Sequence, residues 1–343
     1  MIDPTMKHFR GHLAIPEDTL RMRYFKISIF KKPRSDGAKF QDDPIAGQSY
    51  SIPGSISVNA GGIGVRLQPR GACIYCGATI YASNRSRLLS DEHIISSGVG
   101  GNIVLPESSC QTCADYTSAV ETAVLGKLLW APRHRLRLRS RDQRRERKGF
   151  TFSSVVGGKP VELKLPLDRH PTTLFMPSLL APGILANRPI GKSGIHGLWT
   201  HWLNDLSLAN ADELLTPALD MVLFCQFVAK IGHGFAAATV GNDMFLSLLP
   251  DLICRKFKRM EQFPECYHLV GGHSKRFPPG AALHELGLAF TERNRDVFLS
   301  TQIRLFANLG APVYVAVVGR LNPGVTPKEV LARLEISRKR FPK

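Results

Sequence analysis

The sequence predicts an α+β fold in which a small cysteine-bounded unit of two strands and a helix is embedded in a larger mixed chain. Four cysteines fall in two Cys-x-x-Cys pairs, Cys73 with Cys76 and Cys110 with Cys113. Short alternating apolar segments, which are typical of strands, lie towards both ends of the chain. Apolar residues recur at helical spacing from about 196 to 258, so the C-terminal region is expected to be first helical and then β-containing.

The length and composition allow several units. At 343 residues, 43% of them hydrophobic, the chain can bury two or three cores of ordinary size. We expect an N-terminal β-rich region, the cysteine-bounded unit, a basic linker or edge strand, and a C-terminal α+β region of unknown role. Their predicted boundaries are 1–70, 71–130, 131–150 and 151–343.

The charge is strongly positive. The chain has 45 Lys and Arg against 28 Asp and Glu, a net charge of +17. Because basic side chains release counterions when they pair with phosphates, this excess favours nucleic acid as the partner over a membrane. We find no apolar run of about 18 residues and no apolar leader, and therefore expect no membrane span, no secretory signal and a cytoplasmic location.

The cysteine spacing indicates a structural metal. In a reducing compartment, Cys-x-x-Cys pairs bind metal more often than they form disulfides. Two such pairs can supply the four thiolates that structural Zn²⁺ requires, and Cys110 and Cys113 would lie on one side of a first helical turn. We therefore predict a zinc site, with buried thiols or a redox pair as the alternatives.

The elements of the central unit follow from its patterning. Apolar pairs flank Glu92 and His93 in one short strand, the Gly-rich segment 96–101 connects it to a second strand at 102–105, and a helix is expected to begin near 106–109. Its apolar face would continue to Leu128.

A basic stretch follows this unit. Residues 131–148 hold nine basic and two acidic side chains. The first half alternates basic and apolar residues, which fits an edge strand, and the stretch is either a solvated linker or a contact for phosphates. The candidate phosphate contacts are Arg133, Arg135, Arg137 and Arg139.

Outside this unit the patterns are simpler. We expect strands near 24–30 and 56–58 with a loop at 31–49, and a hairpin over 150–167 followed by a connector at 171–194. Helical patterns span 196–208, 211–238 and 242–258. Strands are predicted at 286–290, 297–306 and 313–318, and a last helix is predicted to begin after Thr326 and Pro327.

Glu92 and His93 suit hydrolytic chemistry. A histidine with an ordinary pKa of about 6.5 can take a proton from water at neutral pH. A neighbouring carboxylate can hold a divalent cation that stabilises charge on a phosphate oxygen. A Glu-His pair on a strand is more often structural, but its position between the two cysteine pairs favours function.

The segments CIYCG, DEHII, GGN and SCQTC, within Cys73 to Glu121, resemble the HNH endonucleases, in which a four-cysteine treble-clef zinc site holds a ββα-metal unit. The resemblance implies hydrolysis of phosphodiester bonds, in double-stranded DNA more than in RNA. It makes His93 the general base, Glu92 a ligand of a catalytic Mg²⁺ or Mn²⁺, and Asn102 the residue that orients the loop beneath His93.

One position departs from the family. Many members follow the last zinc cysteine with Asn or His, a ligand of the catalytic metal, where this chain has Ala114. Asp115 is the first candidate to replace that ligand, and Glu121 is the second. Ala114 also motivates the alternative that the chain is a non-catalytic, zinc-containing nucleic-acid-binding protein. A protein-interaction module built on the zinc unit is a third hypothesis.

Overall fold

The structure is a computed structural model that combines helices with mostly antiparallel sheets, and it confirms the predicted α+β class. The loop predicted at 31–49 and Arg139 lie outside the described residues. The structure describes residues 26–28, 55–59, 64–82, 88–138, 149–156, 159–203, 213–215, 219–255, 266–273 and 277–339.

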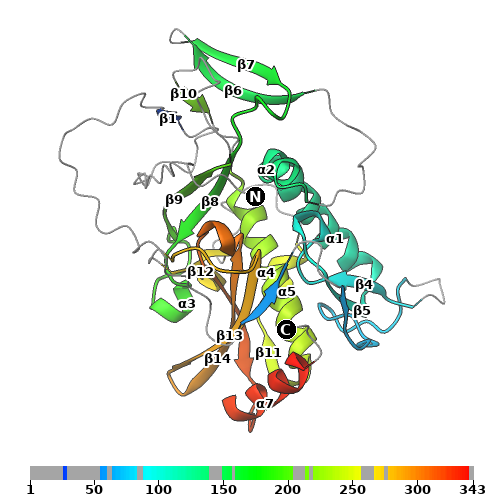
Figure 1. Cartoon of the computed structure of the whole chain (residues 1–343). Helices are drawn as coiled ribbons and strands as arrows, with labels where there is room; N and C mark the ends of the chain where they lie inside the picture. The colour runs from blue at the N-terminus through cyan, green and yellow to red at the C-terminus, as the bar shows by residue number, and fades with distance from the viewer. Residues whose placement is uncertain are drawn as a thin grey trace.

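The largest sheet has six antiparallel strands and forms the centre of the molecule (Figure 1). Its order is β11-β15-β14-β13-β2, and β12 also pairs with β15. These strands confirm the predictions near 56–58 and in the last quarter of the chain. Their bounds are β2 Ile56–Val58, β11 Phe245–Ser247, β12 Val270–Gly272, β13 His284–Arg293, β14 Asp296–Leu305 and β15 Tyr314–Leu321.

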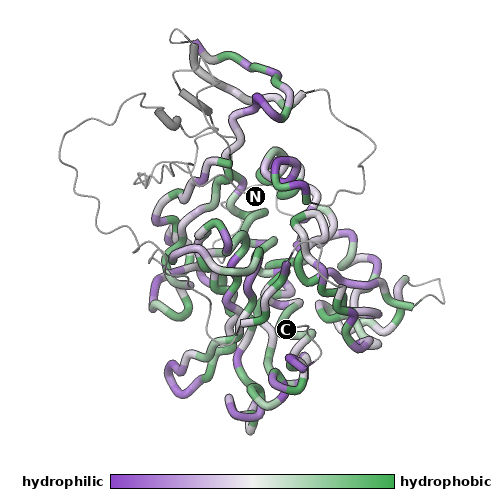
Figure 2. Tube along the Cα trace, in the orientation of Figure 1, coloured by the Kyte–Doolittle hydropathy of each residue, from purple (hydrophilic) through white to green (hydrophobic). Residues whose placement is uncertain are grey.

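Helix α4, Met221–Thr239, packs on β14 and β15 and is buried along almost its whole length. Figure 2 shows that α4 and the strands around it are the most hydrophobic part of the fold. The helix can approach the sheet closely because Gly232 has no side chain: a Cβ there would lie 2.6 Å from Ala316 Cβ. α4 is long and apolar enough to cross a membrane, but 94% of its apolar window is buried inside the protein, so it is the core helix of this fold.

Two further sheets lie outside the cysteine-bounded unit. One has the order β1-β10-β6-β7, and the other is the antiparallel pair β8 and β9. The hairpin predicted over 150–167 is confirmed by β6 and β7. Strands β1 and β2 of the N-terminal region both pair with strands of the C-terminal region. The bounds are β1 Lys26–Ser28, β6 Phe150–Val156, β7 Lys159–Leu165, β8 Thr173–Leu179, β9 Ile195–Trp202 and β10 Glu213–Leu215.

Three predictions for the middle of the chain are wrong, and a fourth, the helix at 211–238, is wrong at its start, because Glu213–Leu215 form β10 and α4 begins at Met221. The helix expected at 196–208 is wrong in its described part, because Ile195–Trp202 form strand β9, whose residues are buried on both faces. The connector at 171–194 contains β8 and the short helix α3, Gly183–Ala186. The segment 242–258 holds a 3₁₀ turn, β11 and the short α5, Pro250–Ile253, rather than one helix.

The described part of the C-terminal region also contains helices α6 and α7. The predicted terminal helix is confirmed as α7, Pro327–Arg338, with Thr326 and Glu329 forming a capping box. Helix α6 spans Cys266–Leu269. The prediction of an edge strand in the first half of 131–148 is wrong for residues 131–135, because these residues belong to helix α2, Trp130–Arg135.

Candidate metal centre

The cysteine-bounded unit is a three-stranded sheet followed by a helix (Figure 1). β3, Val65–Arg66, runs parallel to β5, Ile103–Ser109, and β4, Ser90–His93, runs antiparallel to it. Helix α1, Gln111–Ala123, follows, and a π-helical turn, Val124–Leu128, links it to α2. The two predicted strands and the helix are therefore present in the predicted order.

Helix α1 begins later than expected. The predicted start at 106–109 is wrong, because these residues continue β5 and Cys110 is the N-cap. The carbonyls of Pro106, Glu107 and Ser108 accept hydrogen bonds from the backbone amides of Arg70, Gly71 and Ile74. This pairing extends the strand and ties it to the first cysteine pair.

The four cysteines form one cluster. Their Sγ atoms all lie within 4.8 Å of one another, and those of Cys76 and Cys110 are 3.6 Å apart. The first pair is shaped by a tight turn in which the Gly77 amide donates to the Cys73 carbonyl over 2.8 Å, and Gly77 has a φ of 76° that favours glycine. The second pair spans the N-cap and first turn of α1, where Cys113 is buried.

This geometry fits a tetrahedral metal. Zinc–sulfur bonds of about 2.3 Å imply sulfur–sulfur distances of about 3.8 Å in a tetrahedron. A hydrogen bond from Cys113 lowers the pKa of Cys73 to about 4, which favours a thiolate within the cluster. The four cysteines can therefore hold a structural metal such as zinc, as the sequence predicted. Among the described residues this is the one group of metal-ligating side chains so arranged.

A buried ion-pair cluster lies beside the metal site. Lys230 Nζ, on α4, is 2.7 Å from Glu92 Oε1 on β4 and 2.8 Å from Glu121 Oε1 on α1. The same ammonium donates to the carbonyl of His93 and, over 3.5 Å, to that of Ile94. Four oxygen atoms from two elements of the small unit thus surround one positive charge supplied by the core helix.

The electrostatics of this cluster favour a charged lysine. Burial alone would lower the pKa of Lys230, but the carboxylates of Glu121 and Glu92 raise it above its ordinary value. Burial also raises the pKa of Glu92, and the charge of Lys230 opposes that rise. Two carboxyl groups therefore share one fully buried ammonium, one of them buried (Glu92) and the other, Glu121, with 20% of its side chain exposed.

The structure brings Glu121, rather than Asp115, to Glu92. Asp115 is exposed on α1 and lies six positions before Glu121, so the two side chains leave the helix in different directions. Ala114 is half-buried and supplies no ligand atom. Of the two replacements considered for the missing ligand, Glu121 is the one that shares a cation with Glu92.

His93 and Asn102 lie on either side of the connection between β4 and β5, and both are half-buried. The Cα of His93 pairs with that of Val104. The Asn102 carbonyl accepts from the amide of Val65 over 2.8 Å, which joins β3 to the sheet. The connection turns closely at Gly101, where a Cβ would lie 2.0 Å from the Ile95 carbonyl oxygen.

Side chains from outside the unit fix this connection. His284 Nε2 donates to the Val99 carbonyl over 2.7 Å, because its Nδ1 accepts from the Phe306 amide over 3.1 Å. Arg133 donates to the Gly98 carbonyl. Burial lowers the pKa of His284 to about 4, so the ring is neutral at physiological pH.

Helix α4 also holds the first cysteine pair. His233 Nε2 donates to the Ile74 carbonyl over 2.7 Å, and Asn242 donates to the same oxygen over 2.9 Å. Ser247 Oγ donates to His233 Nδ1 over 3.2 Å. Sequence reasoning missed Lys230 as a site residue. The signal was present as the one charged residue in a helix that is otherwise mostly apolar.

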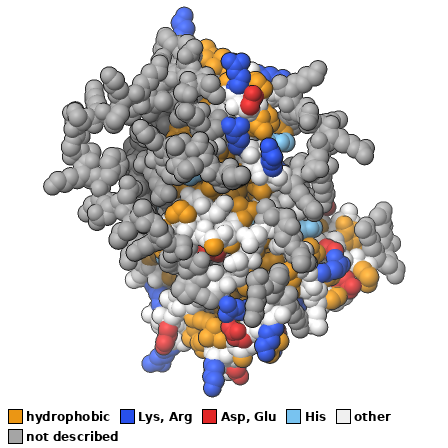
Figure 3. All heavy atoms as spheres, viewed as in Figure 1, with side chains coloured by type: hydrophobic (Ala, Val, Ile, Leu, Met, Phe, Trp, Pro, Cys, Tyr) orange, Lys and Arg blue, Asp and Glu red, His pale blue; other side chains and the backbone are white. Residues whose placement is uncertain are grey.

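The candidate phosphate contacts divide into two groups. Arg133 and Arg135 are half-buried and donate to backbone carbonyls, those of Gly98 and Leu125 for Arg133 and that of Leu167 for Arg135. Arg137 is exposed. On the face shown in Figure 3, Lys and Arg side chains lie at both ends of the molecule, mixed with acidic ones.

The fold and site define an α+β protein with a four-cysteine site close enough to bind a metal. Comparisons with protein-family models, with curated proteins and with solved structures each gave no match to this chain.

Proposed function

We propose that the chain is an HNH-type endonuclease that hydrolyses phosphodiester bonds of nucleic acid, with double-stranded DNA as the preferred substrate. The observation that carries the proposal is the convergence of Glu92 from β4 and Glu121 from α1 on one positive charge. A carboxylate pair on these two elements supplies what Ala114 lacks. The net charge of +17 supports a polyanionic substrate.

His93 is the proposed general base. It follows Glu92 directly on β4, and its backbone carbonyl is held by Lys230. A neutral imidazole can accept a proton from the attacking water. Asn102, directly before β5, lies at the other end of the connection and is proposed to keep that connection in register.

The oxygen donors around Lys230 suit a hard cation. Carboxylate and backbone carbonyl oxygens, here from Glu92, Glu121 and His93, are the ligands that Mg²⁺ and Mn²⁺ prefer. A bound divalent ion would stabilise negative charge on the scissile phosphate. Because the Lys230 ammonium lies among these donors, such an ion binds there only if the lysine side chain moves.

This position of Lys230 favours a second candidate function. If Lys230 stays ion-paired with both carboxylates, the unit binds no catalytic metal and serves as a zinc-stabilised scaffold for nucleic-acid binding. Ala114 agrees with that alternative. Its distinguishing property is steep salt-dependent binding of DNA or RNA without cleavage.

A nicking assay separates the two candidates. Purified protein is incubated with supercoiled plasmid or with RNA, in the presence of Mg²⁺ or Mn²⁺, and binding is measured in parallel by fluorescence anisotropy. For the endonuclease we expect His93→Ala to keep zinc and DNA binding but to lower the rate of cutting by at least about 10²-fold. Equal cutting by wild type and this variant would overturn the proposal.

Two substitutions on α1 test the carboxylate pair. We expect Glu121→Gln to lose most of the cutting, because it removes one of the two carboxylates that converge. Asp115→Asn, an equivalent change on the exposed side of the same helix, is the matched control and should cut normally. If wild type binds nucleic acid but cuts neither DNA nor RNA with either ion, the scaffold function holds instead.

A further inference from the structure

A pocket lies between helix α3 and the hairpin of β13 and β14. In Figure 1, α3 and this hairpin lie on the left of α4, whereas β4 and β5 lie on the right. The pocket has a volume of about 400 Å³, within the usual range for small-molecule sites. Two arginines, Arg188 and Arg293, line it, and Ile184 and Phe298 add apolar surface.

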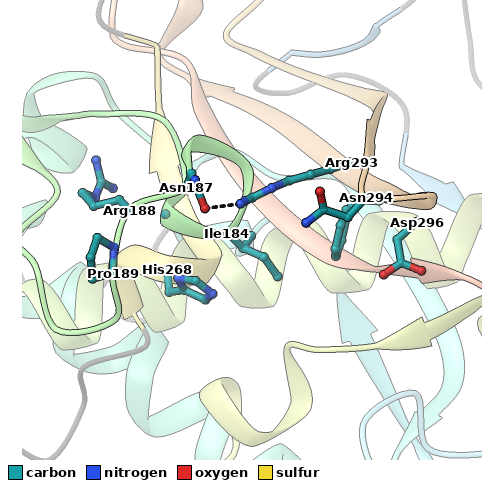
Figure 4. Close-up of a pocket in the computed structure, with 10 residues that line it drawn as sticks. Ile184, Asn187, Arg188, Pro189, His268, Arg293, Asn294 and Asp296 are labelled. Carbon is teal, nitrogen blue, oxygen red and sulfur yellow. Dashed lines mark hydrogen bonds between the residues drawn. The ribbon is translucent and has the colours of Figure 1, made fainter.

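The two arginines have no acidic partner among the described residues. Arg293 donates to the side-chain oxygen of Asn187 across the pocket (Figure 4). Arg188 uses one nitrogen, Nη2, to donate to the carbonyls of Ala181 and Tyr267, over 2.8 and 3.3 Å. A guanidinium has five N–H donors, so both groups keep donors for a ligand.

The acidic group in the pocket is already paired. Both carboxylate oxygens of Asp296 lie 3.2 Å from Arg320 Nη1. The lining therefore presents two positive charges that no carboxylate of the described residues balances. Burial lowers the pKa of Arg188, so an anion placed there would offset the cost of keeping its charge.

The backbone around the pocket is closely fixed. Asn187 ends α3 with a φ of 57°, and Asn294 and Arg295 form the hairpin turn with φ of 50° and 68°. A Cβ at Gly183 would lie 3.0 Å from His268 Nδ1, so α3 packs tightly against α6. The arginines are thus carried on constrained turns, which reduces the ordering that binding requires.

We propose that this pocket binds a nucleoside monophosphate group, with the phosphate on Arg188 and Arg293 and the base against Ile184 and Phe298. Guanidinium groups pair with phosphate oxygens through two parallel hydrogen bonds, and apolar side chains suit the faces of a base. The group could belong to a free nucleotide or to the end of a nucleic-acid strand. This inference does not rest on the proposed nuclease function.

Isothermal titration calorimetry of the full chain tests the site. The probes are adenosine and cytidine 5′-monophosphate, inorganic phosphate, and a 5′-phosphorylated single-stranded oligonucleotide. We expect the mononucleotides to bind more tightly than phosphate, because the apolar wall contributes. Tighter binding of the oligonucleotide would identify a strand end as the source, and binding of the mononucleotides alone would identify a free nucleotide. The proposal would be overturned if none of the probes bound. It would also be overturned if phosphate bound as tightly as the mononucleotides.

Two variants assign the binding to this pocket. Arg293→Met should weaken mononucleotide binding about 10-fold or more, and Arg293→Lys should recover only part of it because the planar fork is lost. Arg338→Met removes an equal charge from α7 and should bind normally. Unchanged binding in Arg293→Met would contradict the assignment. Zinc content shows that each variant is folded, and unchanged plasmid nicking separates this site from the nuclease centre.

Discussion

Lys230 Nζ lies 2.7 Å from the carboxylate of Glu92, and the two side chains expose only 1% and 7% of their surface. The pair connects the core helix α4 to strand β4, and Glu121 extends it to α1. Together with the hydrogen bond from His233 to the Ile74 carbonyl, it fixes the metal-binding unit on the core at two points. The stability of that unit therefore depends on residues that lie more than a hundred positions away in the sequence.

The first prediction concerns this ion pair. Lys230→Met leaves the buried carboxyl group of Glu92 and the half-buried one of Glu121 without their cation, and should lower the free energy of unfolding by about 3–5 kcal/mol. Urea unfolding at neutral pH measures the change. Lys328→Met, at an exposed position on α7, is the control and should change stability by about 0.5 kcal/mol or less.

The same experiment has a second arm. Adding Glu92→Gln to Lys230→Met removes one of the two carboxylates that have lost their cation, so the double variant should be more stable than Lys230→Met alone. A loss below about 1 kcal/mol in the single variant would show that the cluster contributes little.

The second prediction concerns the four-cysteine site. Cys76 is exposed, so Cys76→Ser removes a thiolate with little change in packing. We expect elemental analysis to find about one zinc per wild-type chain and almost none in this variant, with a lower unfolding temperature because structural zinc supplies folding energy. Cys225→Ala, a buried cysteine outside the cluster, should keep its zinc. A Cys76→Ser protein with undiminished zinc would contradict the assignment.

The local features of the site could be predicted because their causes are local. The four cysteines, the strand with Glu92 and His93, and the Gly-rich turn all depend on residues close together in sequence. The start of the last helix after Thr326 was predicted from an equally local signal, the proline in its first turn. Strands β14 and β15 could also be predicted, because the apolar residues that indicate a strand lie within each segment itself.

The features that were missed depend on distant partners. Nothing near Glu92 in the sequence indicates that Lys230 will neutralise it, because the two meet only when α4 docks. The start of α1 was misplaced because residues 106–108 pair with the backbone of residues 70–74, a contact that no local propensity encodes. Strand β9 was mistaken for a helix because burial on both faces removes the alternation that identifies a strand.

The third prediction concerns pH. The unfolded chain protonates His284 near its ordinary pKa of about 6.5, whereas burial lowers the folded pKa to about 4. Stability from this residue is therefore present above pH 6.5 and is lost as the pH falls towards 4. At pH 5 the loss amounts to about 2 kcal/mol.

Urea unfolding at pH 7 and pH 5 measures this effect. His284→Gln keeps a donor for the Val99 carbonyl but cannot titrate, so the difference between the two pH values should shrink by about 2 kcal/mol. His196→Gln, an exposed histidine on β9, is the control. An unchanged pH difference in His284→Gln would show that other groups dominate the acid sensitivity.

The last prediction separates two arginines of the basic stretch. Arg133 is half-buried and donates to the carbonyls of Gly98 and Leu125, so Arg133→Met should lower the free energy of unfolding by about 1–3 kcal/mol. Arg137 is exposed beyond the end of α2, so Arg137→Met should leave stability unchanged. If Arg137 contacts a phosphate, this variant binds duplex DNA more weakly, and the slope of log affinity against log salt falls by about 1. Fluorescence anisotropy between 50 and 200 mM salt, roughly the range over which such contacts weaken, measures the affinity for DNA and its slope against salt. An unchanged slope in Arg137→Met would place the nucleic-acid contacts elsewhere on the protein.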